Sequence, residues 1–236
     1  MSSLVVSEIF GPTIQGEGQY AGQLVAFIRL GGCNLACSWC DTPYTWDASR
    51  FDLRNEMTRT PVNEILERVL EIDVEKVVIS GGEPLLQQRQ SGWENLLIAL
   101  EDAGIGVHIE TNGTIIPNSA SLAGVEHFTV SPKLAHSGDT STKRLNQEAF
   151  EAFRKLSIHG AAIFKFVVKD ESDLDEVAEI VNKYNLIHET IWIMPEGDTT
   201  EKQLASLKKI ANAVIERRWN LTTRIHTLIW DLKRGV

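Results

Sequence analysis

The sequence predicts an α/β protein built on a parallel sheet, in the form of a partial, open β/α barrel. Short apolar runs, which are typical of buried strands, alternate with longer segments whose apolar residues recur at helical spacing. About six or seven such strand–helix units follow one another, whereas a closed barrel of this type has eight. We find neither a linker rich in Gly, Pro or Ser nor an internal repeat, so we expect a single domain over residues 1–236.

The predicted strands are short and mostly β-branched or aromatic. They lie at residues 24–30, 76–80, 107–110, 125–130, 162–168 and 190–194, with one more at 221–225. The predicted helices begin at recognisable signals. These signals are Thr60-Pro61 as a cap with a proline at the first helical position, Ser172 as a cap, and Thr200 with Gln203 as a capping box. Further helices are expected around residues 93–100 and 147–156. Residues 41–59 form the main irregular connection, and their length favours a functional loop.

The composition excludes several classes of protein. Acidic residues outnumber basic ones by 32 to 23, which gives a net charge of −9. Proteins that bind nucleic acid usually carry a basic surplus, so we expect no nucleic-acid partner. No apolar run approaches the roughly 18 residues of a transmembrane helix, and we expect no membrane association. The first residues, Met1-Ser2-Ser3-Leu4, lack the features of a signal peptide, which predicts a cytoplasmic protein.

All three cysteines, Cys33, Cys37 and Cys40, lie within eight residues. Their odd number argues against a disulfide framework, and a structural zinc site usually needs four ligands. A thioredoxin-like dithiol would leave Cys33 unexplained, and covalent haem attachment would need a histidine where Asp41 stands. An iron–sulfur cluster fits better, because three thiolates would leave one iron of a four-iron cubane free to bind a small molecule.

Distinctive polar segments follow the ends of the predicted strands. Besides the cysteines, they are residues 80–84 (Ser-Gly-Gly-Glu-Pro), 110–113 (Glu-Thr-Asn-Gly), 131–133 (Ser-Pro-Lys) and 194–197 (Met-Pro-Glu-Gly). Each of them alone is ordinary turn chemistry. In parallel α/β folds, however, ligands bind at the carboxyl edge of the strands, so the five segments together predict one binding site.

The cysteine spacing, Cys-x3-Cys-x2-Cys with Trp39 before the last cysteine, resembles the radical S-adenosylmethionine (SAM) superfamily. Two further regions narrow the resemblance. Residues 8–18, Arg29 and Cys40-Asp41-Thr42 are similar to the 7-carboxy-7-deazaguanine synthase family, and so are residues 224–230 and 233–236 near the end of the chain. This resemblance extends from Glu8 to the last residue.

The resemblance implies a concrete reaction. Members of this family convert 6-carboxy-5,6,7,8-tetrahydropterin to 7-carboxy-7-deazaguanine with loss of ammonia, a step in queuosine and 7-deazapurine biosynthesis. It implies one 4Fe–4S cluster with three cysteine ligands, SAM chelated to the fourth iron, and Mg²⁺. The reduced cluster would cleave SAM to a 5′-deoxyadenosyl radical, which abstracts hydrogen from C6 of the pterin. The protein itself would supply position and electrostatics.

The same resemblance implies roles for individual residues. It gives a substrate-binding segment at residues 8–18, a cluster loop at 31–46 and a closing segment at 221–236. The cluster ligands are Cys33, Cys37 and Cys40. The implied SAM contacts are Trp39, Cys40, Asp41, Gly82, Glu83 through its carboxylate, Glu110, Ser131, Pro132, Lys133, Met194, Pro195 and Glu196. The implied substrate contacts are Ile14, Gln15, Gly16, Glu17, Arg29, Ser80 and His226, and Thr42 is the implied magnesium ligand.

The family also suggests partners, namely a one-electron donor such as flavodoxin or ferredoxin and a second copy of the chain in a homodimer. An alternative assignment is another small radical SAM enzyme, such as an activase that generates a glycyl radical. That enzyme would share the cysteines and Gly81-Gly82 but would not need residues 15–17 or His226. A non-catalytic iron–sulfur carrier or a zinc-binding module would bind no SAM.

Overall fold

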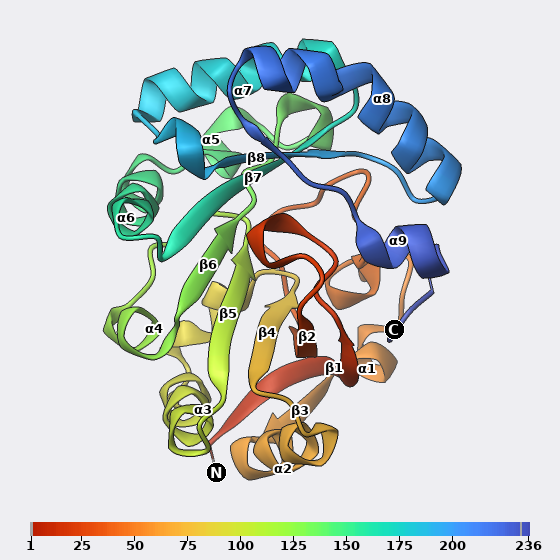
Figure 1. The fold of residues 1–236 in the computed structure, drawn as a ribbon. Coiled ribbons are helices and arrows are strands. Elements are labelled where there is room, and N and C mark those ends of the chain that lie inside the picture. Colours follow the sequence, from red (N-terminus) through yellow and green to blue (C-terminus); the bar gives the residue numbers. More distant parts are fainter. Residues whose placement is uncertain (1, 232) are drawn as a thin grey trace.

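A single mixed sheet curves around the centre of the molecule in the computed structural model, which describes residues 2–231 and 233–236 (Figure 1). Its strands are β1 (Ser3–Ile14), β2 (Leu24–Leu30), β3 (Thr58–Pro61), β4 (Lys76–Gly81), β5 (Gly106–Thr111), β6 (His127–Val130), β7 (Ala162–Val168), β8 (Ile191–Pro195) and β9 (Asn220–Leu221). They lie in the order β3-β1-β2-β4-β5-β6-β7-β8-β9.

The seven strands β2, β4, β5, β6, β7, β8 and β9 pair in parallel, each with the next. β1 pairs antiparallel with both β2 and β3. Because β3 and β9 are the two edges and do not pair with each other within the described residues, the barrel is open. The predicted fold class, a partial, open β/α barrel with about six to seven parallel strands, is therefore confirmed. The described residues contain no helix with the length and apolar character needed to span a bilayer.

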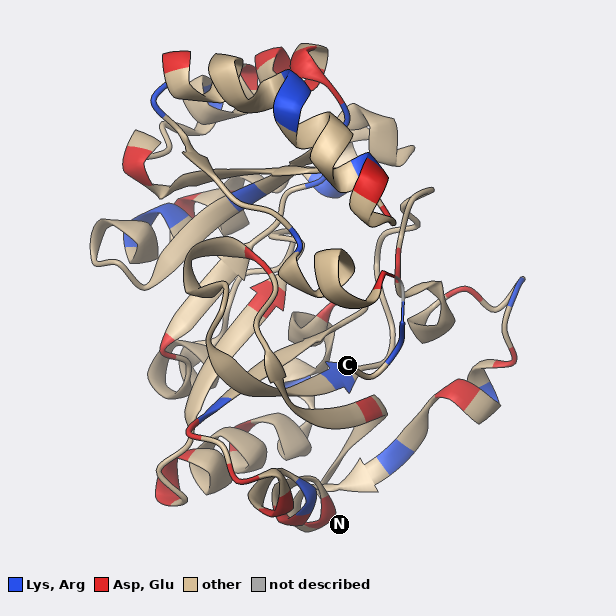
Figure 2. Ribbon diagram, turned by 45° about the vertical axis from the view of Figure 1, so that its right-hand side comes forward, with Lys and Arg blue, Asp and Glu red and all other residues tan. Residues whose placement is uncertain are grey.

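The helices are α1 (Leu53–Glu56), α2 (Val62–Ile72), α3 (Ser91–Asp102), α4 (Ser119–Gly124), α5 (Ser141–Arg144), α6 (Gln147–Ile158), α7 (Glu171–Tyr184), α8 (Thr200–Glu216) and α9 (Ile225–Trp230). The longer ones cover the outer face of the sheet, whereas α9 packs against the start of α8 (Figure 1). Short 3-10 turns are η1 (Gly18–Tyr20), η2 (Pro43–Thr45), η3 (Pro84–Arg89), η4 (Ala135–Ser137) and η5 (His188–Thr190). Acidic and basic residues are interspersed along the outer helices, as expected for a solvated surface (Figure 2).

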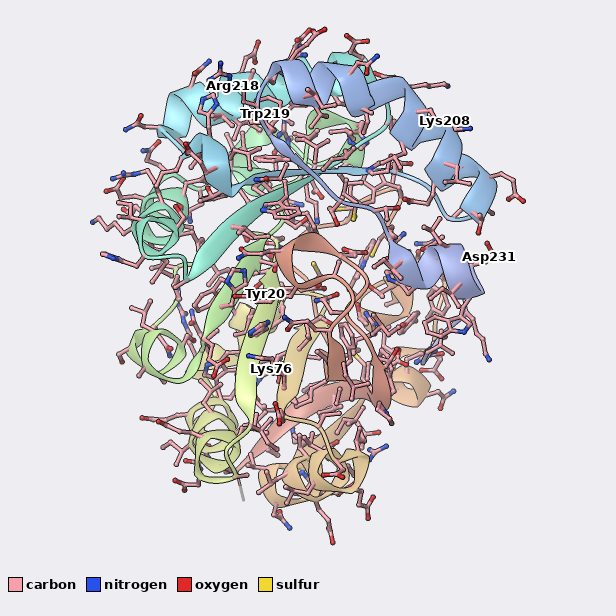
Figure 3. The ribbon with its side chains drawn as sticks, viewed as in Figure 1. Tyr20, Lys76, Lys208, Arg218, Trp219 and Asp231 are labelled. Carbon is pink, nitrogen blue, oxygen red and sulfur yellow. The ribbon has the colours of Figure 1, made fainter. Side chains whose placement is uncertain are left out.

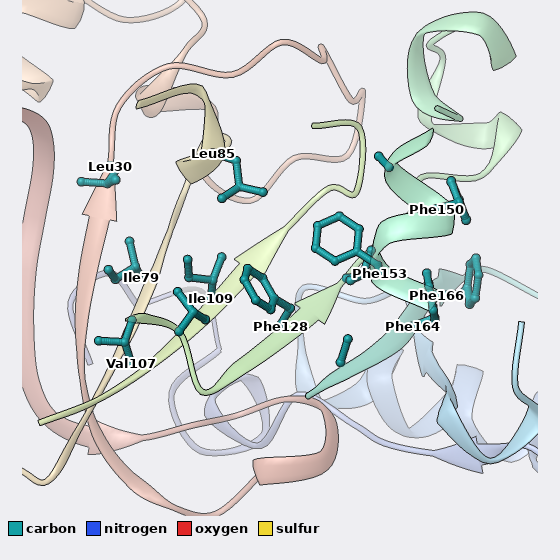
Figure 4. Packing of buried hydrophobic residues seen from close by; sticks show 14 of the residues in the cluster. Leu30, Ile79, Leu85, Val107, Ile109, Phe128, Phe150, Phe153, Phe164 and Phe166 are labelled. Carbon is teal, nitrogen blue, oxygen red and sulfur yellow. The ribbon is translucent and has the colours of Figure 1, made fainter. Parts of the chain in front are cut away.

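The main core lies between the outer face of the sheet and these helices. Alternate strand residues such as Ile79, Ile109 and Phe128 point into it and are fully or almost fully buried (Figure 4). Phe128 meets Phe153 of α6 with ring centroids 5.5 Å apart. The period of two along each strand sends the intervening side chains to the concave face, which is where the polar residues gather.

The lower part of the concave face is filled by aromatic rings. Tyr20 of η1 lies 4.5 Å from the ring of His108 on β5 and 4.7 Å from the ring of His127 on β6, between ring centroids (Figure 3). His108 and His127 are paired neighbours in the sheet, and both are buried. Burial lowers the pKa of each imidazole to about 4. Space for a ligand therefore remains only at the upper part of the concave face, within the described residues.

The structure corrects the predicted start of α2. Thr60 and Pro61 belong to β3, which pairs with Leu4 and Ser3 of β1, so the helix begins at Val62. Pairing with a neighbouring strand, which the local sequence does not reveal, outweighs the helix-start signal. The predicted strand at 221–225 is also shorter, because β9 ends at Leu221 and α9 starts four residues later.

Two other predicted caps shift by one or two residues. The cap of α7 is Asp170, whose carboxylate accepts a hydrogen bond from the Ser172 backbone N–H at 3.0 Å. The cap of α8 is Thr199, and Gln203 makes no capping box. The Gln203 amide instead donates to the carbonyl oxygens of Pro195 and Gly197, at 3.0 and 2.8 Å. Gln203 thus holds the loop after β8 against α8.

Candidate active site

One cavity opens at the carboxyl edge of the parallel strands, where the sequence predicted a ligand site. The predicted site residues that line it are Ile14, Gln15, Glu17, Arg29, Cys33, Cys37, Trp39, Cys40, Asp41, Thr42, Ser80, Gly82, Glu110, Ser131, Lys133, Met194, Glu196 and His226. The fold thus brings side chains from residue 14 to residue 226 to one place. Four predicted residues lie behind the lining, namely Gly16, Glu83, Pro132 and Pro195.

The three cysteines are free thiols on the loop that follows β2, and all three border the same cavity. Burial raises the pKa of the Cys33 thiol to about 12 and also raises the pKa of Cys37. The Trp46 indole donates a hydrogen bond to the Cys40 sulfur at 3.3 Å. Three unpaired thiols at one cavity fit the donor set of an iron–sulfur cluster with one iron left for another ligand, and binding of iron would displace their protons.

Close contact between glycines brings β4 up to the cysteine loop. The Glu83 N–H donates to the Gly32 carbonyl at 2.8 Å, and the Gly82 N–H donates to the Leu30 carbonyl at 3.1 Å. A Cβ atom added to Gly82 would lie 2.0 Å from the Gly32 oxygen. Only glycine fits at Gly82, so the sequence Gly81-Gly82 is explained by backbone packing as well as by its place in the cavity wall.

Glu83, a predicted SAM contact, lies behind the cavity lining. Its side chain is fully buried behind the cavity, and its carboxylate accepts hydrogen bonds from Leu85 N, Thr111 Oγ1 and Asn112 N at 3.0, 2.9 and 2.7 Å. Burial raises the pKa of Glu83, and these hydrogen bonds oppose the rise. The carboxylate joins the ends of β4 and β5, so the expected contact with SAM does not follow from its position.

The cysteine loop is also bound to the end of β5. The Asn112 amide donates to the Asn34 side-chain oxygen at 2.9 Å, and the Asn34 amide donates to Thr114 Oγ1 at 2.8 Å. Asn112 lines the cavity and Asn34 follows Cys33. The segment 110–113, read from the sequence as a ligand contact, therefore also positions the cysteine loop.

A network of charges, buried except for Asp41, forms one wall of the cavity. The Glu17 carboxylate forms ion pairs with Lys165 of β7 and with Arg224, whose Nε lies 2.9 Å from Glu17 Oε1. Arg224 forms a second ion pair with Asp41 of the cysteine loop. Burial alone would raise the pKa of Glu17, but the ammonium of Lys165 and the guanidinium of Arg224 hold it well below its usual range. Glu17 therefore stays ionised.

The residues beside Glu17 connect the start of the chain to its end. The Ile225 N–H donates to the Gly16 carbonyl at 2.9 Å, and the Gly18 N–H donates to Thr222 Oγ1 at 3.1 Å. A Cβ on Gly16 would lie 1.9 Å from His226 Nδ1, so Gly16 leaves the space that this imidazole occupies. Burial lowers the pKa of His226. Gly16 and His226, two predicted substrate contacts, thus meet, although only His226 faces the cavity.

Arg29 stands at the opposite wall, on β2. Its Nε lies 3.1 Å from Glu8 Oε1 on the paired strand β1, and its guanidinium lies 5.6 Å from the centre of the Phe10 ring. The same Glu8 oxygen accepts from the Tyr44 hydroxyl at 2.6 Å. Ser80, which is directly opposite Arg29 in the sheet, has a buried hydroxyl without a hydrogen-bond partner among the described residues. This wall offers donors to an anionic ligand.

Lys165 and Arg224 are charged residues of the cavity lining that the predicted site omitted. Lys165 had a recognisable signal, because it is the one charged residue in the otherwise apolar run 162–168. Its ammonium is only 4% exposed and points to the concave face. Arg224 stood in the C-terminal segment that carried the family resemblance, but no local pattern singled it out.

The comparisons with known proteins agree over the whole chain. Residues 27–183 match the model of the radical SAM superfamily. The 7-carboxy-7-deazaguanine synthase of Pyrobaculum aerophilum is 36% identical over 98% of this chain and 96% of its own, and that of Bacillus cereus is 30% identical over 100% of both.

Solved structures agree as well. The crystal structure of QueE from Escherichia coli has a TM-score of 0.67 with 25% identity and covers 95% of each chain. SuiB of Streptococcus suis bound to S-adenosylmethionine has a TM-score of 0.53 with 19% identity, covers 85% of this chain and 51% of its own, and shows the fold alone. The cysteine loop, the open barrel and the similarity to relatives along the full length lead to one assignment. The chain belongs to the radical SAM superfamily and, within it, to the 7-carboxy-7-deazaguanine synthase family.

Proposed function

We propose that this protein is a carbon–nitrogen lyase that converts 6-carboxy-5,6,7,8-tetrahydropterin to 7-carboxy-7-deazaguanine and ammonia, in 7-deazaguanine and queuosine biosynthesis. Relatives of that name over the full chain length support the activity. The single observation that carries it for this chain is the cavity itself, where three free thiols face a wall of fixed charges. The product and ammonia together contain the same atoms as the substrate, so the elimination needs no net oxidant.

The proposed cofactors are one 4Fe–4S cluster on Cys33, Cys37 and Cys40, SAM and Mg²⁺. When bound, the cluster and SAM supply the radical that removes hydrogen from C6 of the pterin. The chain then has to hold SAM and substrate in reacting geometry and exclude water. Gly81-Gly82, Ser131 and Lys133 support a SAM subsite beside the thiols, because backbone and small polar groups line that part of the cavity.

The substrate is proposed to lie between the two charged walls. Arg29 is suited to bind its carboxylate, since a planar guanidinium pairs with a carboxylate in two parallel hydrogen bonds. Glu17, ionised by its two cationic partners, and the neighbouring Gln15 are suited to accept hydrogen bonds from the amino-pyrimidine edge. Gln15 already donates to Glu110 at 3.1 Å, which fixes the orientation of its amide.

Thr42 is the proposed magnesium ligand, together with the substrate carboxylate and water. Its hydroxyl is a hard oxygen donor at the cavity wall, next to the cluster loop, and lies 3.7 Å from the Cys40 sulfur. A one-electron donor such as flavodoxin or ferredoxin would supply electrons. We also propose a homodimer, on the basis of the family resemblance alone.

The experiment that tests the function is an anaerobic assay with the reconstituted protein, SAM, dithionite and the carboxypterin. Mass spectrometry is expected to detect 7-carboxy-7-deazaguanine from the wild type and none from Cys37→Ala, which should also lose its bound iron. If an intact, SAM-binding cluster cleaves SAM without forming this product, the glycyl-radical activase assignment replaces the present one. If the protein does not bind SAM at all, it is a non-catalytic iron–sulfur protein.

A further inference from the structure

His136 of η4 lies directly behind the SAM part of the cavity and contacts three of its walls. Its ring stacks on Trp39 of the cysteine loop, with centroids 5.5 Å apart and planes 20° apart. Its Nε2 lies 3.2 Å from the carbonyl oxygen of Val167 at the end of β7. Its Nδ1 lies 3.4 Å from Glu196 Oε2 in the loop after β8. Trp39, Val167 and Glu196 all line the cavity, whereas His136 does not.

The segment that carries His136 is itself firmly attached to the cysteine loop. The Ser38 N–H donates to the Ser137 carbonyl at 2.9 Å, and the Ala36 N–H donates to Asp139 Oδ2 at 2.8 Å. On its other side, the Ala135 N–H donates to the Glu176 carboxylate of α7 at 2.9 Å. The backbone around His136 is therefore fixed to the cysteine loop and to α7, and the ring itself is placed by its contacts with Trp39, Val167 and Glu196.

Three buried polar atoms around this histidine lack hydrogen-bond partners among the described residues: Trp39 Nε1, His136 Nδ1 and Glu196 Oε2. Such groups are costly to bury unless something satisfies them. His136 Nδ1 and Glu196 Oε2 face each other at 3.4 Å, and this contact becomes a hydrogen bond when one of the two atoms carries a proton and the β8 loop moves slightly closer. The Trp39 indole N–H remains for an acceptor in the cavity.

We propose that His136 is a positioning residue for SAM, which holds the Trp39 indole and the Glu196 loop in the orientation that binds the cofactor. This inference rests on the proposed function only in that it takes SAM to be the ligand beside Trp39. His136 acts through these two residues and does not touch SAM itself. A ring on the far side of Trp39 restricts the indole to one orientation, while the contact with Glu196 links that orientation to the closing of the β8 loop.

The test measures SAM binding to the anaerobically reconstituted protein by calorimetry, and follows the change that SAM causes in the electron paramagnetic resonance spectrum of the reduced cluster. His136→Ala is expected to raise the Kd for SAM about tenfold, the scale of one aromatic pair with its hydrogen bond. His136→Phe keeps the stacked ring and should raise it only about threefold. The iron content and the KM for the carboxypterin are expected to stay as in the wild type.

Glu196→Gln provides an independent second variant. If the Glu196 contact works through His136, the increase in Kd for the double variant His136→Ala/Glu196→Gln should be smaller than the product of the two single increases. The matched control is His159→Ala, which removes an exposed histidine at the end of α6 and should leave the Kd for SAM unchanged.

Wild-type affinity for SAM in His136→Ala, with the cluster intact, would overturn the proposal. Loss of iron in both His136 variants would overturn it as well, because the residue would then serve the folding of the cysteine loop. Failure of the proposed function gives a different result, in which the wild type makes no deazaguanine while His136→Ala still weakens SAM binding.

Discussion

Lys165 on β7 forms an ion pair with Glu17, which lies 148 residues earlier in the chain, just after β1. The two side chains are only 4% and 11% exposed. Burial alone would lower the pKa of Lys165, but the neighbouring carboxylate of Glu17 raises it, so the ammonium stays protonated. The pair fixes a charged wall of the cavity at the centre of the barrel, and its loss should affect both stability and binding.

The first prediction concerns this ion pair. Lys165→Met should destabilise the protein by at most about 3–5 kcal/mol, the cost of removing one partner from a buried pair, because Arg224 remains paired with Glu17 and limits the loss. It should also weaken carboxypterin binding. Urea unfolding measures the first effect and the KM for the pterin measures the second. Lys208→Met, on the exposed side of α8 (Figure 3), is the control and should change neither. An unchanged urea midpoint for Lys165→Met would contradict the role given to this pair.

The pH dependence of the same wall has a defined sign. The pKa of Glu17 in the folded protein lies below its ordinary value of 4.5, so the pair contributes stability above that value and loses it only as the pH falls through the folded pKa. Between pH 5 and 7, Glu17 should therefore contribute almost no pH dependence to the unfolding free energy of the wild type, which urea unfolding at both pH values measures.

A second prediction follows from the histidines beneath the cavity. His127 has a pKa of about 4 in the folded protein and 6.5 in an unfolded chain, so only the unfolded state takes up its proton near pH 5. Replacement by Phe should reduce the loss of stability between pH 7.5 and 5 by about 1–2 kcal/mol. Thermal unfolding at both pH values measures this, with the exposed His159→Phe as control. Parallel pH profiles for wild type and His127→Phe would show that burial of His127 is not responsible.

A third prediction uses the contact between Gly82 and Gly32. Gly82→Ala would place a Cβ 2.0 Å from the Gly32 oxygen, and should destabilise the fold by about 1–3 kcal/mol through overpacking. Because Cys33 follows Gly32, the variant should also bind less iron on reconstitution. Gly104→Ala is the control: Gly104 has a φ of +72° in open space, so Ala there costs about 1–2 kcal/mol in backbone strain. If both variants bind the full complement of iron, the contact does not position the cysteine loop.

The fourth prediction addresses Thr42. Thr42→Val keeps the shape of the side chain and removes the hydroxyl, so it should raise the Mg²⁺ concentration needed for half-maximal activity by about tenfold or more. Thr42→Ser retains the hydroxyl and should respond to Mg²⁺ like the wild type. Activity titrated with Mg²⁺ after chelation compares the three proteins. The same half-activation in Thr42→Val as in the wild type would remove Thr42 from the proposed magnesium site.

The parallel strands were predictable because each is a short apolar run followed by a turn. The strand 24–30 and the strand 162–168 match β2 and β7 residue for residue. β1 escaped prediction as a strand because Gly11-Pro12 interrupts its apolar pattern. Proline is ordinarily excluded from a paired strand, and here it falls within a register shift between Phe10 and Thr13. Local sequence signals do not show that β1 will pair on both sides.

The site was predictable where chemistry is clustered in the sequence, as at Cys33, Cys37 and Cys40. The rule that ligands bind at the carboxyl edge of parallel strands then identified which segments line the cavity, although the side-chain contacts within it were unknown. What local patterns could not show is which polar groups point inward. Glu83 turns away because three donors behind the wall satisfy its carboxylate, and Lys165 turns inward because the alternation of β7 places it opposite Glu17.

The hydrogen bonds from Ile225 to Gly16 and from Gly18 to Thr222 join an early segment of the chain to one of the last to be synthesised. A nascent chain that has emerged only as far as β8 already holds every cysteine, yet it lacks the guanidinium of Arg224 that bridges Glu17 and Asp41. The cavity wall that contains Arg224 therefore forms last. Until that C-terminal segment leaves the ribosome, iron that binds the cysteines does so in an incomplete cavity.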